Sequence, residues 1–401
     1  MSNQLAIEGG KPVREKMLPF GAPALGDEEI NEVVDTLRSG WISTGPKTKR
    51  FEDEFAAYVG AKYAIALNSC TAGLHLSLVV NHIGPGDEVI VPALTFGATA
   101  NVVEHVGARP VFVDVEPQTC NIDPARTAEA ITSRTRAIIP VHYGGLPCDL
   151  DKIHELARGR NLVVIEDAAH AVGARYNGKM LGTISPLTNF SFYANKNLTT
   201  AEGGMITTEE PALEETLRVY HLHGLSRDAW KRYHVKKFMP SEIVVPGYKY
   251  NMTDVQASIG LHQLRKHEGF VARREELAAF YDQAFAEFDG LLRMQYRPRD
   301  GRNRHVLHLY ILILNLPRFK VTRNEFVDAL LAENIGAAMH FNPLHNMPYY
   351  RNKYGYKPED LPVANEIGNS VLSLPLTPQM TARDAQDVVD GVTKVVKAFV
   401  A

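Results

Sequence analysis

The chain has 401 residues, of which 45% are hydrophobic and 22% charged, and its formal net charge is −3 at neutral pH. This composition excludes a disordered chain, a collagen-like fibre and a coiled coil, and it disfavours a nucleic-acid binder that depends on overall basicity. Three cysteines without a CxxC pair favour a reducing compartment and argue against a disulfide framework or a structural zinc site.

The N-terminal residues lack the apolar stretch of a secretory signal, and no segment predicts a membrane span, so we expect a cytoplasmic protein that binds no membrane.

The first predicted helix covers residues 25–40. Short apolar runs rich in Val, Ile, Phe and Tyr then predict about seven buried strands, at residues 63–69, 88–95, 110–115, 137–143, 161–168, 189–193 and 203–208. Helical patterns such as 125–135 and 150–161 separate most of them. This alternation predicts a mainly parallel sheet with helices on both faces.

The rest of the chain follows a different pattern. A long helical pattern over residues 253–290 predicts a connecting helix. The tail predicts a smaller α/β domain, with a strand at 308–314, a helix at 323–336, a strand at 337–342 and a last helix at 384–399. We therefore divide the chain into a large domain at residues 1–250 and a connecting helix with a small domain at residues 251–401.

Polar side chains follow several predicted strands, where ligands bind in open parallel sheets. Asp167 ends the fifth strand, and its carboxylate fits either a helix cap or a protonated ring nitrogen. Lys196, between the last two strands, is either a solvated lysine or a Schiff-base lysine. Small residues at 68–73 open a helix whose N–H groups are either ordinary caps or an anion site. Phe96, after the second strand, is either a core residue or a plate for a flat ring.

Together these residues place an anion cup, an aromatic plate, a carboxylate and a lysine at one edge of one sheet. A pyridoxal 5'-phosphate (PLP) site needs these elements to hold the phosphate, cover the ring, keep the ring nitrogen protonated and form the Schiff base. The sequence has no GxGxxG or Walker motif, which disfavours a plain NAD- or nucleotide-binding α/β protein.

Several motifs resemble those of the DegT/DnrJ/EryC1/StrS family of PLP-dependent sugar aminotransferases, which have the aspartate aminotransferase fold type I. They lie between about residues 40 and 350 in the order of the family, and they read GWISTGPKTKRFE, NSCTAGLHL, VPALTF, IIPVHYGG, VIEDAAHAVG, FSFYANKNLTTAEGGMI, PGYKYNMTDVQASIG and MHFNPLHNMPYY. AEGGM, HLHGL, PGYKYN and HFNPLH most resemble the subgroup of UDP-4-amino-4-deoxy-L-arabinose–oxoglutarate aminotransferases. The implied fold agrees with the predicted seven-stranded, mainly parallel sheet and smaller C-terminal α/β domain.

The resemblance implies three catalytic residues. Lys196 would form the Schiff base with the cofactor and later move the proton to the substrate carbon. Asp167 would pair with the ring nitrogen, and His170 would lie near the ring or its phenolic oxygen. Some family members replace the lysine by histidine and become dehydratases, so the presence of Lys196 favours the aminotransferase.

The resemblance also implies the cofactor contacts. Thr71 and Ala72 would bind the phosphate through backbone N–H groups, with the Thr71 hydroxyl and Ser191 added. Phe96 would stack on the ring. Asn251 would reach the phosphate from a neighbouring subunit, which implies a homodimer with shared active sites.

The implied reaction moves the amino group of L-glutamate, which becomes 2-oxoglutarate, to the C4 keto carbon of a UDP-linked 4-keto sugar by a ping-pong mechanism. Lys231 and Arg232, in a basic segment, either meet the UDP diphosphate or belong to a solvated loop. His340 and His345 either close over the sugar or are ordinary turn residues, and no third ligand accompanies them, so we expect no metal. Residues 41–47 resemble a loop at the mouth of the substrate site.

Other functions stay open at this point. The same fold would serve amination at C3 of a dTDP-linked keto sugar, or of a cyclitol ketone. A non-catalytic PLP-binding regulatory protein is disfavoured because both Asp167 and Lys196 are present. Lipopolysaccharide biosynthesis, O-antigen sugars and flagellin glycans stay open as the setting.

Overall fold

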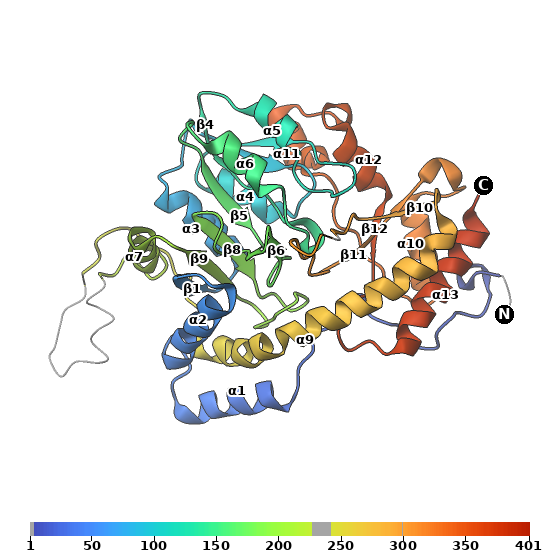
Figure 1. Cartoon of the computed structure of the whole chain (residues 1–401), viewed down its shortest axis with the longest axis horizontal. Helices are drawn as coiled ribbons and strands as arrows, with labels where there is room; N and C mark the ends of the chain where they lie inside the picture. The colour runs from blue at the N-terminus through green and yellow to red at the C-terminus, as the bar shows by residue number, and fades with distance from the viewer. Residues whose placement is uncertain (1–3, 227–241, 299) are drawn as a thin grey trace.

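A seven-stranded sheet forms the centre of the computed structural model, which describes residues 4–226, 242–298 and 300–401. Its strands are β1 (Tyr63–Leu67), β2 (Glu88–Pro92), β3 (Arg109–Val113), β4 (Thr135–Ile138), β5 (Val163–Asp167), β8 (Leu187–Ser191) and β9 (Gly204–Thr208). They lie in the order β1-β9-β8-β5-β4-β2-β3 (Figure 1). β9 runs antiparallel to both neighbours and the other pairs are parallel, so the predicted sheet is confirmed.

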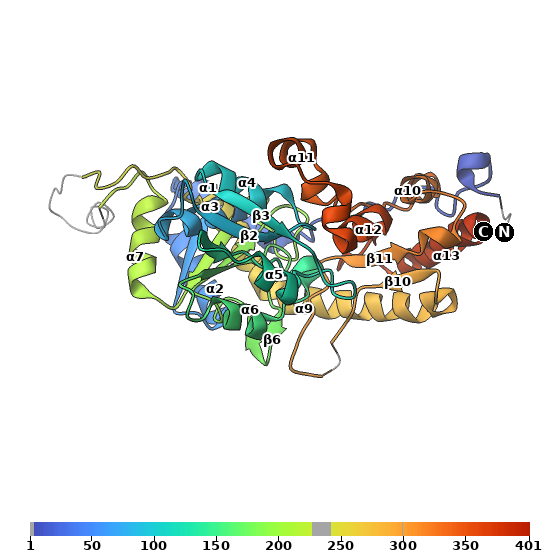
Figure 2. The same cartoon turned by 90° about the horizontal axis from the view of Figure 1, so that it is seen from above.

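Helices cover both faces of this sheet. The helices of this part of the chain are α1 (Asp27–Ser39), α2 (Pro46–Val59), α3 (Cys70–Val80), α4 (Gly97–His105), α5 (Pro124–Ala130), α6 (Leu150–Ala157), α7 (Pro211–Tyr220) and α9 (Asp254–Phe285). Of these, α1 packs on α9 and not directly on the sheet. α2, α6 and α9 lie on one side of the sheet and α3 and α4 on the other (Figure 2). Apolar side chains of each set pack on the face that they cover. This cover on two sides leaves most residues of the strands buried. A short hairpin, β6 (Arg175–Tyr176) and β7 (Lys179–Met180), follows β5.

The C-terminal part is built around a three-stranded antiparallel sheet. It contains β10 (Leu292–Met294), β11 (Tyr310–Leu314), β12 (Val371–Leu374), α10 (Arg323–Ala332), α11 (Pro348–Tyr354), α12 (Pro362–Ser370) and α13 (Ala382–Phe399). The predicted strand at 337–342 is wrong. Ala338 makes an isolated bridge to Ser373, whereas Phe341 packs against the core of the large sheet, and β12 completes the small sheet.

The long helix α9 runs from the large sheet to the small one, and the two chain ends lie together beside the small sheet (Figures 1 and 2). Leu5 and Leu18 of the N-terminal segment pack in the core of the small sheet. Residues of α11 and α12 pack on the large sheet instead. The division at residue 250 stays a prediction. Within the described part of the chain, no helix has both the length and the apolar character to cross a bilayer.

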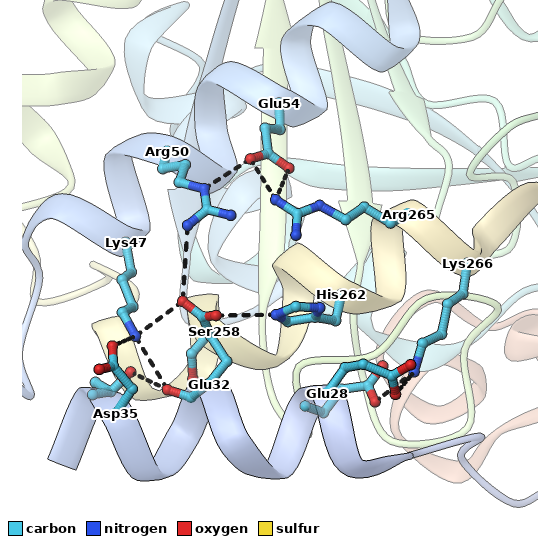
Figure 3. Close-up of polar contacts among 12 residues, drawn as sticks. Glu28, Glu32, Asp35, Lys47, Arg50, Glu54, Ser258, His262, Arg265 and Lys266 are labelled. Atoms are coloured by element: carbon cyan, nitrogen blue, oxygen red, sulfur yellow. Dashed lines mark hydrogen bonds and ion pairs between the residues drawn. The ribbon is translucent and has the colours of Figure 1, made fainter. Parts of the chain in front are cut away.

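Ion pairs hold α1 and α2 against α9 (Figure 3). Lys266 of α9 lies 2.8 Å from Glu28 of α1. Glu32 of α1 lies 3.0 Å from Lys47 of α2 and 3.0 Å from His262 of α9. These contacts fix the two N-terminal helices beside the start of α9, next to the carboxyl end of β1.

Candidate active site

The predicted site residues meet at the carboxyl ends of β1, β5 and β8. Leu67 of β1 and Ser191 of β8 flank Gly204 of β9 in one row of the sheet. Asp167 of β5 pairs with Asn189, two residues before Ser191. The N-terminus of α3 and the loop after β8 therefore leave the sheet at the same edge, beside Asp167.

Asp167 is buried, and its carboxylate accepts two hydrogen bonds. Oδ2 accepts from the Thr99 hydroxyl at 2.9 Å and Oδ1 from the Ala169 N–H at 3.2 Å. Burial raises the pKa of Asp167, while the Thr99 hydroxyl and the Ala169 N–H act in the opposite direction. Because both partners donate, the surroundings suit the ionised carboxylate, which at this depth needs a cationic partner.

Lys196 is half-buried in the loop after β8. Burial lowers the pKa of its amine to about 8, although Asp167 and Cys70 act in the opposite direction. An amine with this pKa is partly neutral near neutral pH, and the neutral form attacks carbonyl carbons. Lys196 therefore has the property that a lysine needs to bond to the aldehyde of PLP.

Three imidazoles lie close to Lys196. His170 follows β5, His308 precedes β11, and His340 lies between α10 and α11. Burial, with the charge of Lys196 added, lowers the pKa of His340 to about 4 and the pKa values of His170 and His308 well below their ordinary value. All three side chains are therefore neutral hydrogen-bonding groups near neutral pH.

The partners of two of these rings define their tautomers. His170 Nδ1 accepts from the Gly144 N–H at 3.3 Å, which leaves the ring proton on Nε2. His308 Nδ1 lies 3.1 Å from Asn197 Oδ1 and therefore donates, which leaves Nε2 as an acceptor. The two rings lie 4.4 Å apart, centroid to centroid.

The first turn of α3 and the end of β8 supply groups for a phosphate. Ser69 caps α3, and its hydroxyl accepts the N–H of Ala72 at 3.1 Å, so that N–H already has a partner. Thr71 is half-buried in the same turn, and Ser191 is buried across Gly204. A Cβ on Gly204 would lie 2.4 Å from the Ser69 backbone, so a glycine allows this close approach. Helix-terminal N–H groups and two hydroxyls fit a phosphate.

Aromatic rings border the cluster. Phe96, directly before α4, is 64% exposed, and its ring lies 6.0 Å from that of Phe341. Phe341 in turn stacks on His170 at 6.0 Å with 22° between the ring planes. The exposed ring of Phe96 is available to cover a flat ligand.

Asn251 lies beside the end of β1 and is joined to the loop at 41–47. Its Nδ2 donates to the hydroxyl of Thr44, and its Oδ1 accepts from Lys249 Nζ at 2.6 Å. Asp254, which is buried at the start of α9, accepts three backbone N–H groups from the start of α2. The loop at 41–47 is therefore fixed to the segment that carries Asn251.

The four predicted substrate contacts have different outcomes. His340 lies near Lys196, with Nδ1 at 2.9 Å from the hydroxyl of Ser373. His345 is fully buried, with its ring 6.3 Å from that of Tyr356, so its predicted contact with the sugar is not supported. Its burial under α11 keeps the imidazole from a ligand. Lys231 and Arg232 lie outside the described residues.

Sequence reasoning missed Thr99, His308 and Phe341. Thr95 lies in the segment before α4 and Thr99 lies in its first turn, so the sequence places the two hydroxyls close along the chain but does not show that they are bonded. His308 opens the apolar run of β11, and Phe341 lies inside the HFNPLH motif. These positions are visible in the sequence, but their contacts with Asp167 and His170 come from distant parts of the chain.

Comparison with known proteins agrees with this geometry. The model of the DegT/DnrJ/EryC1/StrS aminotransferase family matches residues 23–393. An uncharacterized protein of Methanocaldococcus jannaschii is 52% identical over 384 residues, which cover 96% of this chain and 99% of that protein. The spore coat polysaccharide biosynthesis protein SpsC of Bacillus subtilis is 49% identical over 385 residues, which cover 96% and 98%. The PLP form of the putative sugar aminotransferase Spr1654 from Streptococcus pneumoniae has a TM-score of 0.86 and 34% identity over 95% of this chain and 99% of that one.

Proposed function

We propose that this chain moves the amino group of L-glutamate to the C4 keto carbon of a UDP-linked 4-keto sugar. The chain belongs to the DegT/DnrJ/EryC1/StrS aminotransferase family. The protein is a PLP-dependent sugar aminotransferase. The observation that carries the proposal is the electrostatic interaction between the buried carboxylate of Asp167 and Lys196, whose pKa burial lowers to about 8. The nucleotide, the sugar position and the donor rest on the motif resemblance.

When bound, PLP supplies an electrophilic carbonyl carbon and a conjugated ring that accepts the electron pair left at the substrate carbon. Lys196 presents a neutral amine for attack, and its Nζ then holds the proton that moves to or from the substrate carbon. Asp167 keeps the ring nitrogen protonated through its negative charge. His170, whose Nδ1 accepts the Gly144 N–H, would have its Nε2 proton free to donate to the cofactor.

Other residues of this chain hold the cofactor in place. The start of α3 with Thr71, and the hydroxyl of Ser191, bind the phosphate. Phe96 covers the ring from its exposed position before α4. Thr71, Ser191 and Phe96 thus have the roles that the sequence predicts. The backbone N–H of Ala72 differs, because it donates to the Ser69 hydroxyl that caps α3.

The sugar lies against neutral groups in this proposal. His340 and His308 offer uncharged imidazole nitrogens, and Phe341 offers an apolar face beside them. Hydroxyl groups of a sugar both donate and accept, which suits neutral imidazoles, and aliphatic sugar faces suit aromatic rings.

The active unit is a homodimer in this proposal, with Asn251 completing the phosphate site of the partner subunit. Exposed apolar side chains on α1 and the loop after it support this proposal. Ile30 and Leu37 lie two turns apart on α1 and are 57% and 56% exposed, and Ile42 is 53% exposed. Apolar side chains at this spacing form a stripe that a second subunit would bury.

The test is a visible absorption spectrum followed by substrate assays. The PLP-loaded protein should show a visible band that decreases when L-glutamate is added, with release of 2-oxoglutarate. The aminated protein should then convert a UDP-4-keto sugar, and a dTDP-3-keto sugar serves as the matched alternative. A band that glutamate leaves unchanged contradicts the donor, and conversion of the dTDP-3-keto sugar alone contradicts the acceptor.

A further inference from the structure

Two buried hydroxyl groups form a chain that ends at Asp167. Thr95 Oγ1 lies 2.9 Å from Thr99 Oγ1, and Thr99 Oγ1 lies 2.9 Å from Asp167 Oδ2. Thr95 is 1% exposed and Thr99 is 0% exposed, so solvent does not replace either bond. The two threonines come from the segment between β2 and the first turn of α4, and Asp167 comes from the end of β5.

The direction of the protons in this chain follows from the number of donors. An ionised carboxylate can only accept, so the Thr99 hydroxyl donates to Asp167. The Thr99 hydroxyl has one proton, so it must accept from Thr95. Hydrogen bonds that run in one direction polarise one another, and the bond that reaches the carboxylate is strengthened.

We propose that Thr99, supported by Thr95, is a positioning residue that keeps Asp167 ionised and turned toward the ring nitrogen of PLP. This inference rests on the role proposed for Asp167. The Thr99 hydroxyl is the largest of the effects that counter the rise in the pKa of Asp167 caused by burial. With Oδ2 bound to Thr99 and Oδ1 to the Ala169 N–H, the orientation of the carboxylate is fixed.

The same short segment also carries the aromatic plate. Phe96 lies between the two threonines, and its carbonyl oxygen accepts the N–H of Thr99 at 3.2 Å. One turn at the start of α4 therefore sets both the exposed ring of Phe96 and the hydroxyl that reaches Asp167. The cover of the cofactor ring and the charge near its nitrogen are fixed by one rigid element.

Other ionisable groups act on Asp167 and must be kept constant in a test. Lys196, from the loop after β8, and His142, from the end of β4, both lower the pKa of Asp167. The thiol of Cys70, at the start of α3, is close enough for Asp167 to raise its pKa, along with burial. None of these residues contacts the Thr95 and Thr99 hydroxyls in the hydrogen bonds of the described residues.

The test replaces the Thr99 hydroxyl in the PLP-loaded protein by a methyl group of similar size, with Thr99→Val. Two quantities are measured: the pH midpoint of the visible absorption band and the dissociation constant for PLP. Without the hydroxyl, the negative charge on Asp167 is less stabilised, so Asp167 stabilises the protonated ring nitrogen less. The ring loses positive charge, so the midpoint of the band rises by about one pH unit and PLP binds about tenfold more weakly.

Three further variants separate this effect from a general loss of packing. Thr99→Ser keeps the hydroxyl and should retain both wild-type values. Thr95→Val leaves Thr99 in place and should shift the midpoint in the same direction by a smaller amount. Thr127→Val is the control, because Thr127 is buried and donates to the Asp123 carbonyl at 2.8 Å in α5, away from the site, and it should change neither quantity.

A Thr99→Val protein with the wild-type midpoint and PLP affinity would overturn the inference. If that variant does not fold, an unchanged midpoint in Thr95→Val overturns it instead. Asp167→Asn distinguishes this failure from a failure of the proposed function. If the pH midpoint of the band shifts in Asp167→Asn but not in Thr99→Val, only the role of Thr99 is contradicted. If the midpoint does not shift in Asp167→Asn, the role proposed for Asp167 is contradicted.

Discussion

The imidazole of His142 and the carboxylate of Glu166 form a hydrogen bond of 2.8 Å in which neither side chain is exposed. Glu166 directly precedes Asp167 in the chain. The backbone N–H of His142 donates to the backbone carbonyl of Asp167 at 3.1 Å. The pair therefore joins the ends of β4 and β5 beneath the carboxylate of the site. Burial raises the pKa of Glu166, but His142 and the hydrogen bonds from Ser185 and Thr188 hold it below its usual range.

Replacement of Glu166 should destabilise the protein strongly. The Ser185 N–H and the Thr188 hydroxyl donate to Glu166 Oε1, and His142 Nε2 donates to Oε2, so the NH₂ group of Glu166→Gln faces a donor in either orientation. The variant also breaks a buried pair, so the free energy of unfolding should fall by about 3 kcal/mol in urea titrations. The pKa of Glu166 is lowered by folding, so its stabilising effect is present above about pH 4.3 and is lost as the pH falls further. The difference between the two proteins should therefore shrink below that pH.

Asp53→Asn is the matched control for this measurement. Asp53 forms an ion pair with Lys49 on the surface of α2, with both side chains 63% exposed. Its replacement should change the free energy of unfolding by less than about 0.5 kcal/mol. An effect of similar size in the two variants would contradict the importance given to the buried pair.

The amine of Lys196 should titrate near pH 8 in the protein without cofactor. Burial lowers the pKa of Lys196, so its reaction with an amine-directed acylating reagent, followed by peptide mass spectrometry, should rise through a midpoint near pH 8. An ordinary lysine reacts with a midpoint near pH 10.4 by reference values. Asp167→Asn removes a charge that raises the pKa of Lys196, so the midpoint should move further down. A higher midpoint in that variant would contradict the proximity of the two residues.

Removal of the Lys196 amine should abolish turnover while leaving the fold intact. Lys196→Ala should lose about a thousandfold or more in kcat and should lack the visible band, because the amine that attacks the cofactor is gone. Lys196→Arg keeps a positive charge but no nucleophilic amine, and it should be equally inactive. Activity in the arginine variant would show that charge, and not nucleophilicity, is what this position supplies.

A shared site predicts that two inactive variants restore each other. Asn251→Asp brings a negative charge to the phosphate site proposed for the partner subunit, and Lys196→Ala removes the amine of its own subunit. Because a mixed dimer then contains one intact site and one doubly damaged site, equal mixing with subunit exchange should recover about a quarter of the wild-type activity. No recovery in dimers shown to have exchanged, by sedimentation and mass spectrometry of tagged chains, would mean that Asn251 serves its own subunit.

The large sheet and several of the residues at its edge can be predicted from the sequence alone. The apolar runs were long enough to define the seven strands, and the α/β alternation indicated that most of them run parallel. Parallel strands end at a common edge, so Asp167 and Lys196 are placed together from their positions at the ends of predicted strands, whereas Ser191 follows from the motif resemblance. The motif around Lys196 then indicated which loop would supply the amine.

The identity of the distant segments that meet at that edge depends on the packing of the whole fold. The segment 337–342 predicts a strand, but Phe341 stacks on His170 and β12 completes the small sheet. His345 lies in the same motif as His340 but is fully buried. Thr99 reaches Asp167 across 68 positions of the chain. Such contacts depend on how helices and sheets pack against one another. Periodicity along the chain indicates which face of a helix or strand is apolar, but it does not indicate which side chains of other elements pack on that face.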